Sequence, residues 1–320
     1  MRIFAFLLIE LLLSPLTLTS FVLLQGWAIA TSKQQHVSIT ALAPLSFRWL
    51  LHIQGIRPDM ATHCLVNNLP ALNSALCWGS VGPTLLAANL TGYAPSFFNA
   101  PPIGEENIGN MINARTLFFD KALAQSLTTA KQIVLLGAGF DTRLLKFCLN
   151  QNLSLFEVDQ SATQQAKIKA LEQSNIDMSE IVYVPVDFNR EDWAVKLQQA
   201  GFEAGERSFF LWEGVTYYLT AAIAKESLLK MAEMSGAGSA IAFDVFSASF
   251  VSASDEWTKI QPVVQLLSFF GEPFRFGVDL RDEACLSDLL RDTGLQVQTT
   301  RLMGTEKGSA FSALVRAVKS

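Results

Sequence analysis

Short apolar runs that alternate with helical stretches fill the second half of the chain, and they limit its fold more than any other feature. Five of these runs read as strands: 133–136, 153–158, 181–186, 208–212 and 240–246. Such spacing is typical of parallel βαβ units whose sheet is covered on both faces. Two further runs, 295–301 and 311–318, leave no room for a crossover helix, so we expect them to be antiparallel. The sequence therefore predicts an α/β fold with a Rossmann-like, seven-stranded, mostly parallel sheet and an antiparallel C-terminal hairpin.

The N-terminal segment, residues 3–30, is almost continuously apolar. About 20 such residues suffice to cross the hydrocarbon core as a helix. Residues 28–30 have the small-x-small form of a signal-peptide cleavage site, but the apolar run is about twice as long as a usual signal-peptide core. We expect an uncleaved membrane anchor over residues 1–32. Because Glu10 is costly in lipid, a helix that lies in the interface and a spanning helix that starts after Glu10 are the alternatives.

A change of character near residue 104 predicts a domain boundary there. Helical stretches are expected around 44–53, 61–67 and 81–88, and a loop rich in glycine and proline follows them. A longer helical run then covers 108–127. The predicted organisation is an anchor at 1–32, a helical region on the substrate side at 33–104, and an α/β domain at 105–320. Basic residues after the anchor weakly favour a cytoplasmic location for that domain.

Charge and cysteine usage exclude two classes of function. The chain has 24 basic and 29 acidic residues, a net charge of −5, and its Lys and Arg residues form no cluster suited to several phosphates. We therefore expect no nucleic-acid partner. The four cysteines form no CxxC pair, and the three histidines all precede residue 64, so we expect neither a metal site nor a disulfide framework.

A glycine-rich turn, Gly137-Ala138-Gly139-Phe140-Asp141-Thr142-Arg143, follows the first predicted strand. Such a turn lets the backbone approach a ligand and points helical N–H groups at its negative end. A dinucleotide fingerprint needs a third glycine where Thr142 stands, and Asp141 would repel a pyrophosphate. The motif favours a ligand that carries an ammonium or sulfonium group and no phosphates.

Acidic residues also end the next three predicted strands. Asp159 lies twenty residues after Gly139, the offset at which a carboxylate accepts hydrogen bonds from ribose hydroxyls. Asp187 can bind an adenine amino group while Phe188 stacks on the base. Glu213 ends the fourth strand, over the crevice where open α/β sheets bind ligands. Each acid alone also suits a helix cap, but the repeated pattern favours a nucleoside site.

These motifs resemble the leucine carboxyl methyltransferase-like group of class I S-adenosylmethionine-dependent methyltransferases, which includes many bacterial O-methyltransferases. The resemblance covers residues 105–245. Its most specific mark is the run GAGFDTR, and the full set of matching segments is 114–116, 118–120, 135–143, 156–160, 186–188 and 213–219. The hydrophobic leader and the region up to residue 104 have no counterpart that we can align.

The resemblance implies a role for several residues toward S-adenosylmethionine. Arg115 would pair with the methionine carboxylate, Asp159 would hold the ribose, and Asp187 the adenine. Glu213 would lie near the methionine amino group and the transferred methyl. The complete predicted cofactor-binding set is Arg115, Gly137, Gly139, Asp141, Asp159, Asp187, Phe188 and Glu213.

Methyl transfer requires alignment of the acceptor, the methyl group and sulfur, and exclusion of water. A carboxylate acceptor needs no base, whereas a hydroxyl acceptor needs one, for which Glu213 and then Tyr217 are the candidates. We expect a small or lipid-like acceptor. A nicotinamide oxidoreductase is disfavoured by Thr142 and by the lack of a Tyr-x-x-x-Lys pair, and a serine hydrolase by the absence of histidine after the first strand. A non-catalytic, membrane-tethered scaffold is the remaining alternative.

Overall fold

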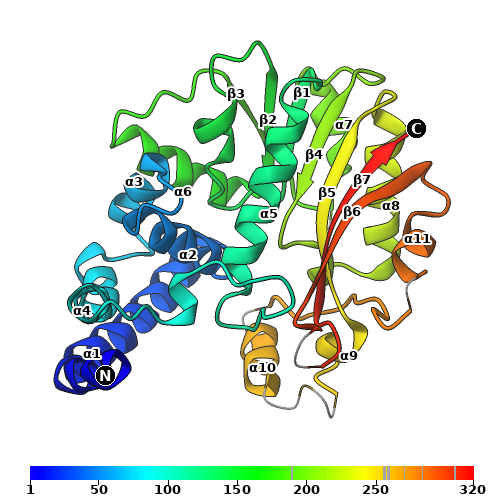
Figure 1. The fold of residues 1–320 in the computed structure, drawn as a ribbon. Helices are drawn as coiled ribbons and strands as arrows, with labels where there is room; N and C mark the ends of the chain where they lie inside the picture. The colour runs from blue at the N-terminus through cyan, green and yellow to red at the C-terminus, as the bar shows by residue number, and fades with distance from the viewer. Residues whose placement is uncertain (189, 255–256, 258–259, 270, 283, 306–307) are drawn as a thin grey trace. The chain divides into compact units, whose positions relative to one another are not determined.

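The computed structural model describes residues 1–320 except 189, 255–256, 258–259, 270, 283 and 306–307 (Figure 1). Two compact units are formed. The first comprises residues 1–100, 139–142 and 162–177, and the second comprises residues 101–138, 143–161 and 178–320. The predicted functional boundaries at residues 32 and 104 stay predictions.

A seven-stranded sheet forms the frame of the second unit, with strand order β3-β2-β1-β4-β5-β7-β6. Strands β1 to β5 are parallel, and β7 pairs antiparallel with both β5 and β6. The predicted fold class is confirmed, and the predicted strand ends lie within two residues of the observed ones. The strands are β1 (Gln132–Leu136), β2 (Ser154–Asp159), β3 (Ile181–Pro185), β4 (Ser208–Trp212), β5 (Ala240–Phe246), β6 (Leu295–Met303) and β7 (Ser312–Lys319).

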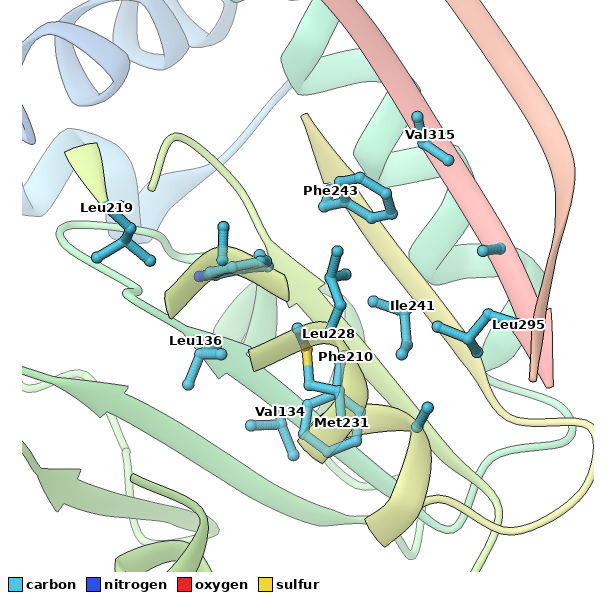
Figure 2. Packing of buried hydrophobic residues seen from close by; sticks show 14 of the residues in the cluster. Val134, Leu136, Phe210, Leu219, Leu228, Met231, Ile241, Phe243, Leu295 and Val315 are labelled. Atoms are coloured by element: carbon cyan, nitrogen blue, oxygen red, sulfur yellow. The ribbon is translucent and has the colours of Figure 1, made fainter. Parts of the chain in front are cut away.

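Both faces of this sheet are buried, because alternate residues of each central strand enter different cores. In β1, Val134 and Leu136 belong to one core, and Ile133 and Leu135 belong to the other. Helix α5 (Met111–Ser126) covers the Ile133 side (Figure 1). The Val134 side packs against α7 (Trp193–Gln199), α8 (Ala221–Met234) and α11 (Cys285–Leu290), as Figure 2 shows for part of this core. The strands are therefore continuous apolar runs, as expected for a sheet covered on both faces.

Short elements complete the second unit. The helix expected after the glycine motif is only a five-residue π-helix, η2 (Leu144–Cys148). A 3₁₀ turn, η3 (Thr216–Tyr218), follows β4. The remaining helices are α9 (Ala248–Val251) and α10 (Gln261–Phe269).

The first unit is helical. Its elements are α1 (Arg2–Gln35), α2 (Leu42–Ile53), α3 (Met60–Asn68), α4 (Ser74–Thr91), η1 (Ser96–Phe98) and most of α6 (Ser161–Glu172). The helices expected around 44–53 and 61–67 are confirmed. Helix α4 begins seven residues before the predicted start at 81, because the Asn73 side chain caps it by accepting a hydrogen bond from the Leu76 N–H.

Candidate functional site

Backbone hydrogen bonds hold the carboxyl ends of β1, β2 and β3 in register. The Gly137 N–H donates to the Val158 carbonyl at 2.8 Å, and the Val186 N–H donates to the Asp159 carbonyl at 2.8 Å. The predicted glycine turn and the acids Asp159 and Asp187 therefore start from the same edge of the sheet, where parallel α/β sheets bind ligands.

Asp159, Asp187 and Phe188 differ in exposure. Asp159 is 9% exposed, and its Oδ1 accepts a hydrogen bond of 2.6 Å from the Gln160 N–H. Asp187 is more open: its side chain is 39% exposed and forms a solvent-facing ion pair of 3.4 Å with Arg190. Phe188 is partly buried against the core that includes Val134. Asp159 is thus held in one orientation, whereas the Asp187 carboxylate faces solvent and can change partners.

Gly137 lies where only glycine fits. Its φ is +68°, in the left-handed region, and a Cβ added to it would stand 2.5 Å from Cγ2 of Val215. A side chain at this position would therefore meet both backbone strain and a clash. The turn is built to bring bare backbone to the edge of the sheet.

Changing Gly137 to alanine should lower the free energy of unfolding by about 2 to 4 kcal/mol, the sum of left-handed strain and overpacking. Urea unfolding followed by circular dichroism measures this loss. The double variant Gly137→Ala/Val215→Ala removes the clash with Val215 and should recover part of the stability, while the strain at φ +68° remains. A Gly137→Ala protein as stable as the parent would contradict the close packing at this turn.

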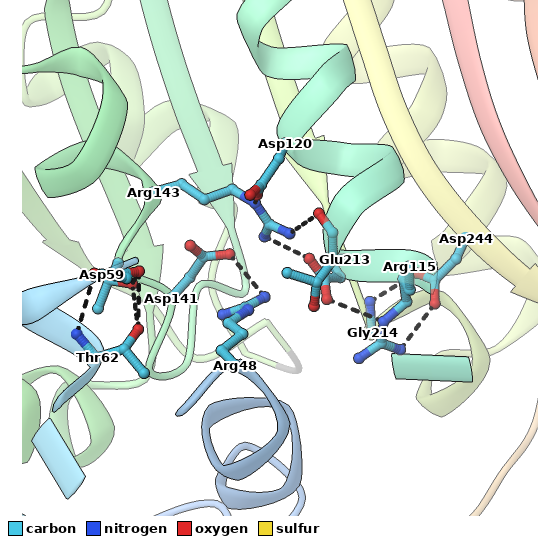
Figure 3. A network of polar contacts seen from close by, with 12 residues as sticks. Arg48, Asp59, Thr62, Arg115, Asp120, Asp141, Arg143, Glu213, Gly214 and Asp244 are labelled. Atoms are coloured by element: carbon cyan, nitrogen blue, oxygen red, sulfur yellow. Dashed lines mark hydrogen bonds and ion pairs between the residues drawn. The ribbon is translucent and has the colours of Figure 1, made fainter. Parts of the chain in front are cut away.

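Arg115 joins α5 to the ends of β4 and β5. Its Nε donates to Oε1 of Glu213 at 3.0 Å, and its Nη1 donates to the Tyr217 hydroxyl and to Oδ2 of Asp244, both at 3.1 Å. All of these side chains are buried (Figure 3). The Nη2 atom makes no hydrogen bond among the residues that the structure describes. The Nη2 group is therefore left for a further acceptor.

Arg143 forms a second bridge to Glu213. Its Nη1 donates to Oε2 of Glu213 at 2.5 Å, its Nε to Oδ1 of Asp120 at 2.6 Å, and its Nη2 to the Thr116 carbonyl at 3.0 Å. The Arg143 side chain is fully buried. Both carboxylate oxygens of Glu213 are thus engaged by guanidinium groups. The network contains two arginines, Arg115 and Arg143, and three acids, Asp120, Glu213 and Asp244, so its formal charge is −1 when all three acids are ionised.

Burial dominates the electrostatics of this network. It raises the pKa of Asp244 above its usual range, although the Arg115 charge and a 2.7 Å hydrogen bond from the Gly214 N–H act in the opposite direction. Burial also raises the pKa of Tyr217 well above the ordinary value, against the lowering effect of Arg115. For Arg115, burial lowers the pKa, but Tyr217, Glu213 and Asp244 more than compensate and hold the guanidinium charged. Tyr217 is therefore a protonated donor or acceptor at neutral pH.

Gly139 and Asp141 belong to the first unit. Gly139 has a φ of +52°, and an added Cβ would lie 3.1 Å from Cβ of Ala41. Asp141 Oδ2 forms a buried ion pair of 3.1 Å with Nη2 of Arg48, and the Lys167 amino group donates to the Asp141 carbonyl. The negative charge of Asp141 is thus partly neutralised by α2 (Figure 3).

Thr142, at the position where a dinucleotide fingerprint needs glycine, is buried and hydrogen-bonded. Its hydroxyl donates to Oδ2 of Asp59 at 2.6 Å. Burial raises the pKa of Asp59, but the Arg57 charge and hydrogen bonds from Thr142, Arg57 and the Thr62 N–H outweigh it and leave that pKa below its usual range. Thr142 therefore ties the glycine motif to the N-terminal cap of α3.

Several residues of these networks were not predicted from the sequence: Arg48, Asp59, Asp120 as a partner of Arg143, and Asp244. Two of them carry a signal in hindsight. Arg48 is a lone charge in the apolar helix α2, and Asp244 is a lone acid in the buried strand β5. A charge in such a place is normally paired, so each marks a buried ion pair even though its partner is unknown. In the described part of the chain, no three His, Cys, Asp or Glu side chains are grouped as metal ligands.

Comparison with known proteins identifies relatives of a part of the chain that includes Arg115, Arg143 and Glu213. Residues 91–232 match the model of the family described as leucine carboxyl methyltransferase. YktD of Bacillus subtilis, whose name marks it as an inferred S-adenosyl-L-methionine-dependent methyltransferase, is 30% identical over 191 residues, which are 58% of this chain and 60% of YktD. A protein of Mycolicibacterium vanbaalenii with the same kind of name is 28% identical over 210 residues, or 62% of this chain and 66% of that protein.

The chain thus spans about three fifths to two thirds of the length of these relatives. Among solved structures, it is similar to an O-methyltransferase family protein from Burkholderia thailandensis, with 16% identity, a TM-score of 0.44, and coverage of 66% of this chain and 57% of that one. The family resemblance inferred from the motifs is confirmed over residues 91–232.

Proposed function

We propose, from the premise that residues 91–232 match the leucine carboxyl methyltransferase family, that this chain transfers a methyl group from S-adenosylmethionine to an oxygen of a small or lipid-like acceptor. The observation that carries the proposal is the Arg115–Glu213–Arg143 network, in which Arg143 is the last residue of the glycine-rich turn. The alternative of a nicotinamide oxidoreductase is disfavoured, because the third glycine of its fingerprint is replaced by a buried, hydrogen-bonded Thr142. The matched relatives carry methyltransferase names, which also disfavours a non-catalytic scaffold.

The residues present fit this cofactor. Gly137 carries no side chain, and Val215 closes the position that a Cβ would take, so the turn can present only bare backbone to a ligand. The Nη2 group of Arg115 suits the methionine carboxylate, since a charged N–H donor forms a strong hydrogen bond with a carboxylate oxygen. Asp159 can accept hydrogen bonds from the ribose, and Asp187 with Phe188 can bind the adenine. The excess negative charge of the arginine network matches a sulfonium and not a pyrophosphate.

The geometry favours a carboxylate as the acceptor. When bound, S-adenosylmethionine supplies an electrophilic methyl group on a positively charged sulfur. Glu213 has both oxygens in ion pairs, and the raised pKa of Tyr217 keeps its proton in place, so neither is free to remove a proton from a hydroxyl. A carboxylate acceptor needs no such base. We assign Glu213 and Tyr217 the role of orienting Arg115. If the acceptor is a hydroxyl, Glu213 is the nearest candidate base.

The N-terminal helix supports the membrane part of the proposal. Helix α1 is long and apolar enough to cross a bilayer, and most of its large apolar side chains are exposed in the structure. A core helix of a soluble protein would bury such side chains. An anchor of this kind would keep the chain at a membrane, on the cytoplasmic side where a soluble nucleoside is available, and would suit a hydrophobic acceptor.

Titration calorimetry of the full-length protein in detergent with S-adenosylmethionine tests the cofactor assignment. We expect binding in the parent and at least tenfold weaker binding in Asp159→Ala, about 1.4 kcal/mol. Glu233→Ala, which removes an exposed acid from α8, is the matched control and should bind like the parent. Absence of binding heat in the parent, or equal affinity in Asp159→Ala, would reject the assignment.

A further inference from the structure

A second helix of the first unit has the character of a membrane element. From Met60 to Gly104 the sequence contains no Asp, Glu, Lys or Arg, and α4 lies within this stretch. Three large apolar side chains of α4 are exposed: Trp78 at 42%, Leu86 at 51% and Leu90 at 68%. A solvated helix face of a soluble protein normally carries charged residues, so this face is suited to an apolar environment.

Helices α1 and α4 form an antiparallel pair. Contacts fix their direction at three levels: Phe6 with Tyr93 (ring centroids 4.9 Å apart), Ser20 with Gly79, and the Trp27 indole N–H with the Pro70 carbonyl (2.9 Å). At the middle level the helices approach so closely that a Cβ added to Gly79 would lie 2.3 Å from the Ser20 hydroxyl. Close packing through small residues is the way helices associate in lipid, where no hydrophobic effect drives them together.

The outer surface of this pair is apolar on both helices. Leu11, Leu12 and Val22 of α1 are 70%, 72% and 67% exposed, in addition to the three side chains of α4. The one acid inside the apolar part of α1, Glu10, is partly buried, and its Oε1 is shielded from solvent. One oxygen of the carboxylate that would oppose insertion is therefore kept away from solvent.

The connections of α4 decide how deeply the pair can insert. Near its start, Trp78 packs on Trp49 of α2, with ring centroids 5.0 Å apart. Seven residues beyond its end, the Phe98 carbonyl accepts a hydrogen bond of 3.2 Å from the side chain of Gln54, the C-cap of α2. Trp49 and Gln54 are only about 7.5 Å apart along a helix. The first part of α4 and the segment that follows its end thus both contact one short helix, α2.

A spanning α4 is incompatible with these ties. Eighteen helical residues measure about 27 Å, close to the thickness of the hydrocarbon core. The chain from Gly92 to η1 would then have to return through lipid, and the residues before η1 are not helical, so their backbone groups would find no hydrogen-bond partners there. Helix α1 runs beside α4 over the whole length of α4. If α4 cannot cross the bilayer, the part of α1 that is paired with it cannot cross either.

We propose that α1 and α4 enter a phospholipid bilayer together, as an in-plane helical pair embedded from one side without crossing it. The proposal extends the membrane part of the proposed function and is independent of methyl transfer. It makes α4 part of the membrane-binding surface, which sequence analysis assigned to residues 1–32 alone. It also leaves both chain termini on the same side of the membrane.

Carbene labelling of the full-length protein tests the proposal. The protein is bound to phosphatidylcholine–phosphatidylglycerol vesicles that contain a lipid with a diazirine in its acyl chain, and labelled residues are mapped by mass spectrometry. We expect label on Trp78, Leu86 and Leu90 as well as on α1. Val182 and Val195 are exposed to a similar degree, 40% and 47%, but lie in the second unit, and they should stay unlabelled.

Point variants and sidedness complete the test. Leu86→Asp/Leu90→Asp should reduce co-flotation with the vesicles at least threefold, whereas Val195→Asp should not change it. Tags at both termini should remain open to protease added outside the vesicles. Label confined to α1, or protection of the N-terminal tag alone, would overturn the proposal. Calorimetry with S-adenosylmethionine is a separate readout, so the failure of one proposal does not imply failure of the other.

Discussion

Replacing Arg115 by methionine is expected to abolish binding of S-adenosylmethionine and to lower the free energy of unfolding by about 3 to 5 kcal/mol. Methionine keeps much of the side-chain volume but removes the charge that Glu213 and Asp244 share at 3.0 Å and 3.1 Å. Asp244 is fully buried, so its carboxylate would be left without its cation in a region that water does not reach. The Nη2 group, which we assign to the methionine carboxylate, is lost at the same time.

A second substitution separates these two effects. In Arg115→Met/Asp244→Asn, the uncompensated charge on β5 is gone, so urea unfolding followed by circular dichroism should show that most of the lost stability returns. Cofactor binding, measured by calorimetry, should stay absent, because no guanidinium is restored. An Arg115→Met protein that binds the cofactor as tightly as the parent would exclude Arg115 from the cofactor site.

The sheet could be predicted from the sequence because its signal is local. In β1 and β4 every residue is apolar or lies at a strand start, and burial on two faces demands this composition whatever the ligand. The glycine turn was predictable for a similar reason. Gly137 has a positive φ, and a glycine directly after a predicted strand is a local signal of such a turn. These features depend on a few neighbouring residues and on general sterics.

The ion pairs could not be predicted, because they join residues that are far apart in the chain. Arg115 and Asp244 are separated by 129 positions, and no sequence pattern links an arginine on α5 to an acid on β5. Arg143 likewise pairs with Asp120 and Glu213, which are 23 and 70 positions away along the chain. The resemblance implied that Arg115 and Glu213 bind the cofactor, but it did not indicate that they contact each other. Only the folded sheet, with its two faces, brings these side chains together.

Glu213→Gln is expected to weaken the binding of S-adenosylmethionine more than the binding of S-adenosylhomocysteine. The two ligands share the carboxylate, ammonium, ribose and adenine and differ in the charged sulfonium with its methyl group. The arginine network carries one excess negative charge, and glutamine removes it, so the environment of the sulfur becomes neutral. At an effective dielectric constant near 20, one charge several ångströms away corresponds to about tenfold to hundredfold in affinity. Calorimetry with both ligands gives the ratio of their dissociation constants.

Asp120→Asn is the matched control for this ratio. Like Glu213→Gln, it removes one negative charge from the network and one partner from Arg143. Asp120 differs from Glu213 in position, because it pairs with Nε of Arg143 whereas Glu213 pairs with Nη1. If the substitution only disturbs the geometry of the network, Asp120→Asn should weaken the binding of both ligands equally. If Glu213→Gln also weakened them equally, Glu213 would act only by holding the two arginines in place. A selective loss for the sulfonium ligand would instead show that the Glu213 carboxylate acts on the charge that methyl transfer removes, because that charge is the main feature that the product lacks.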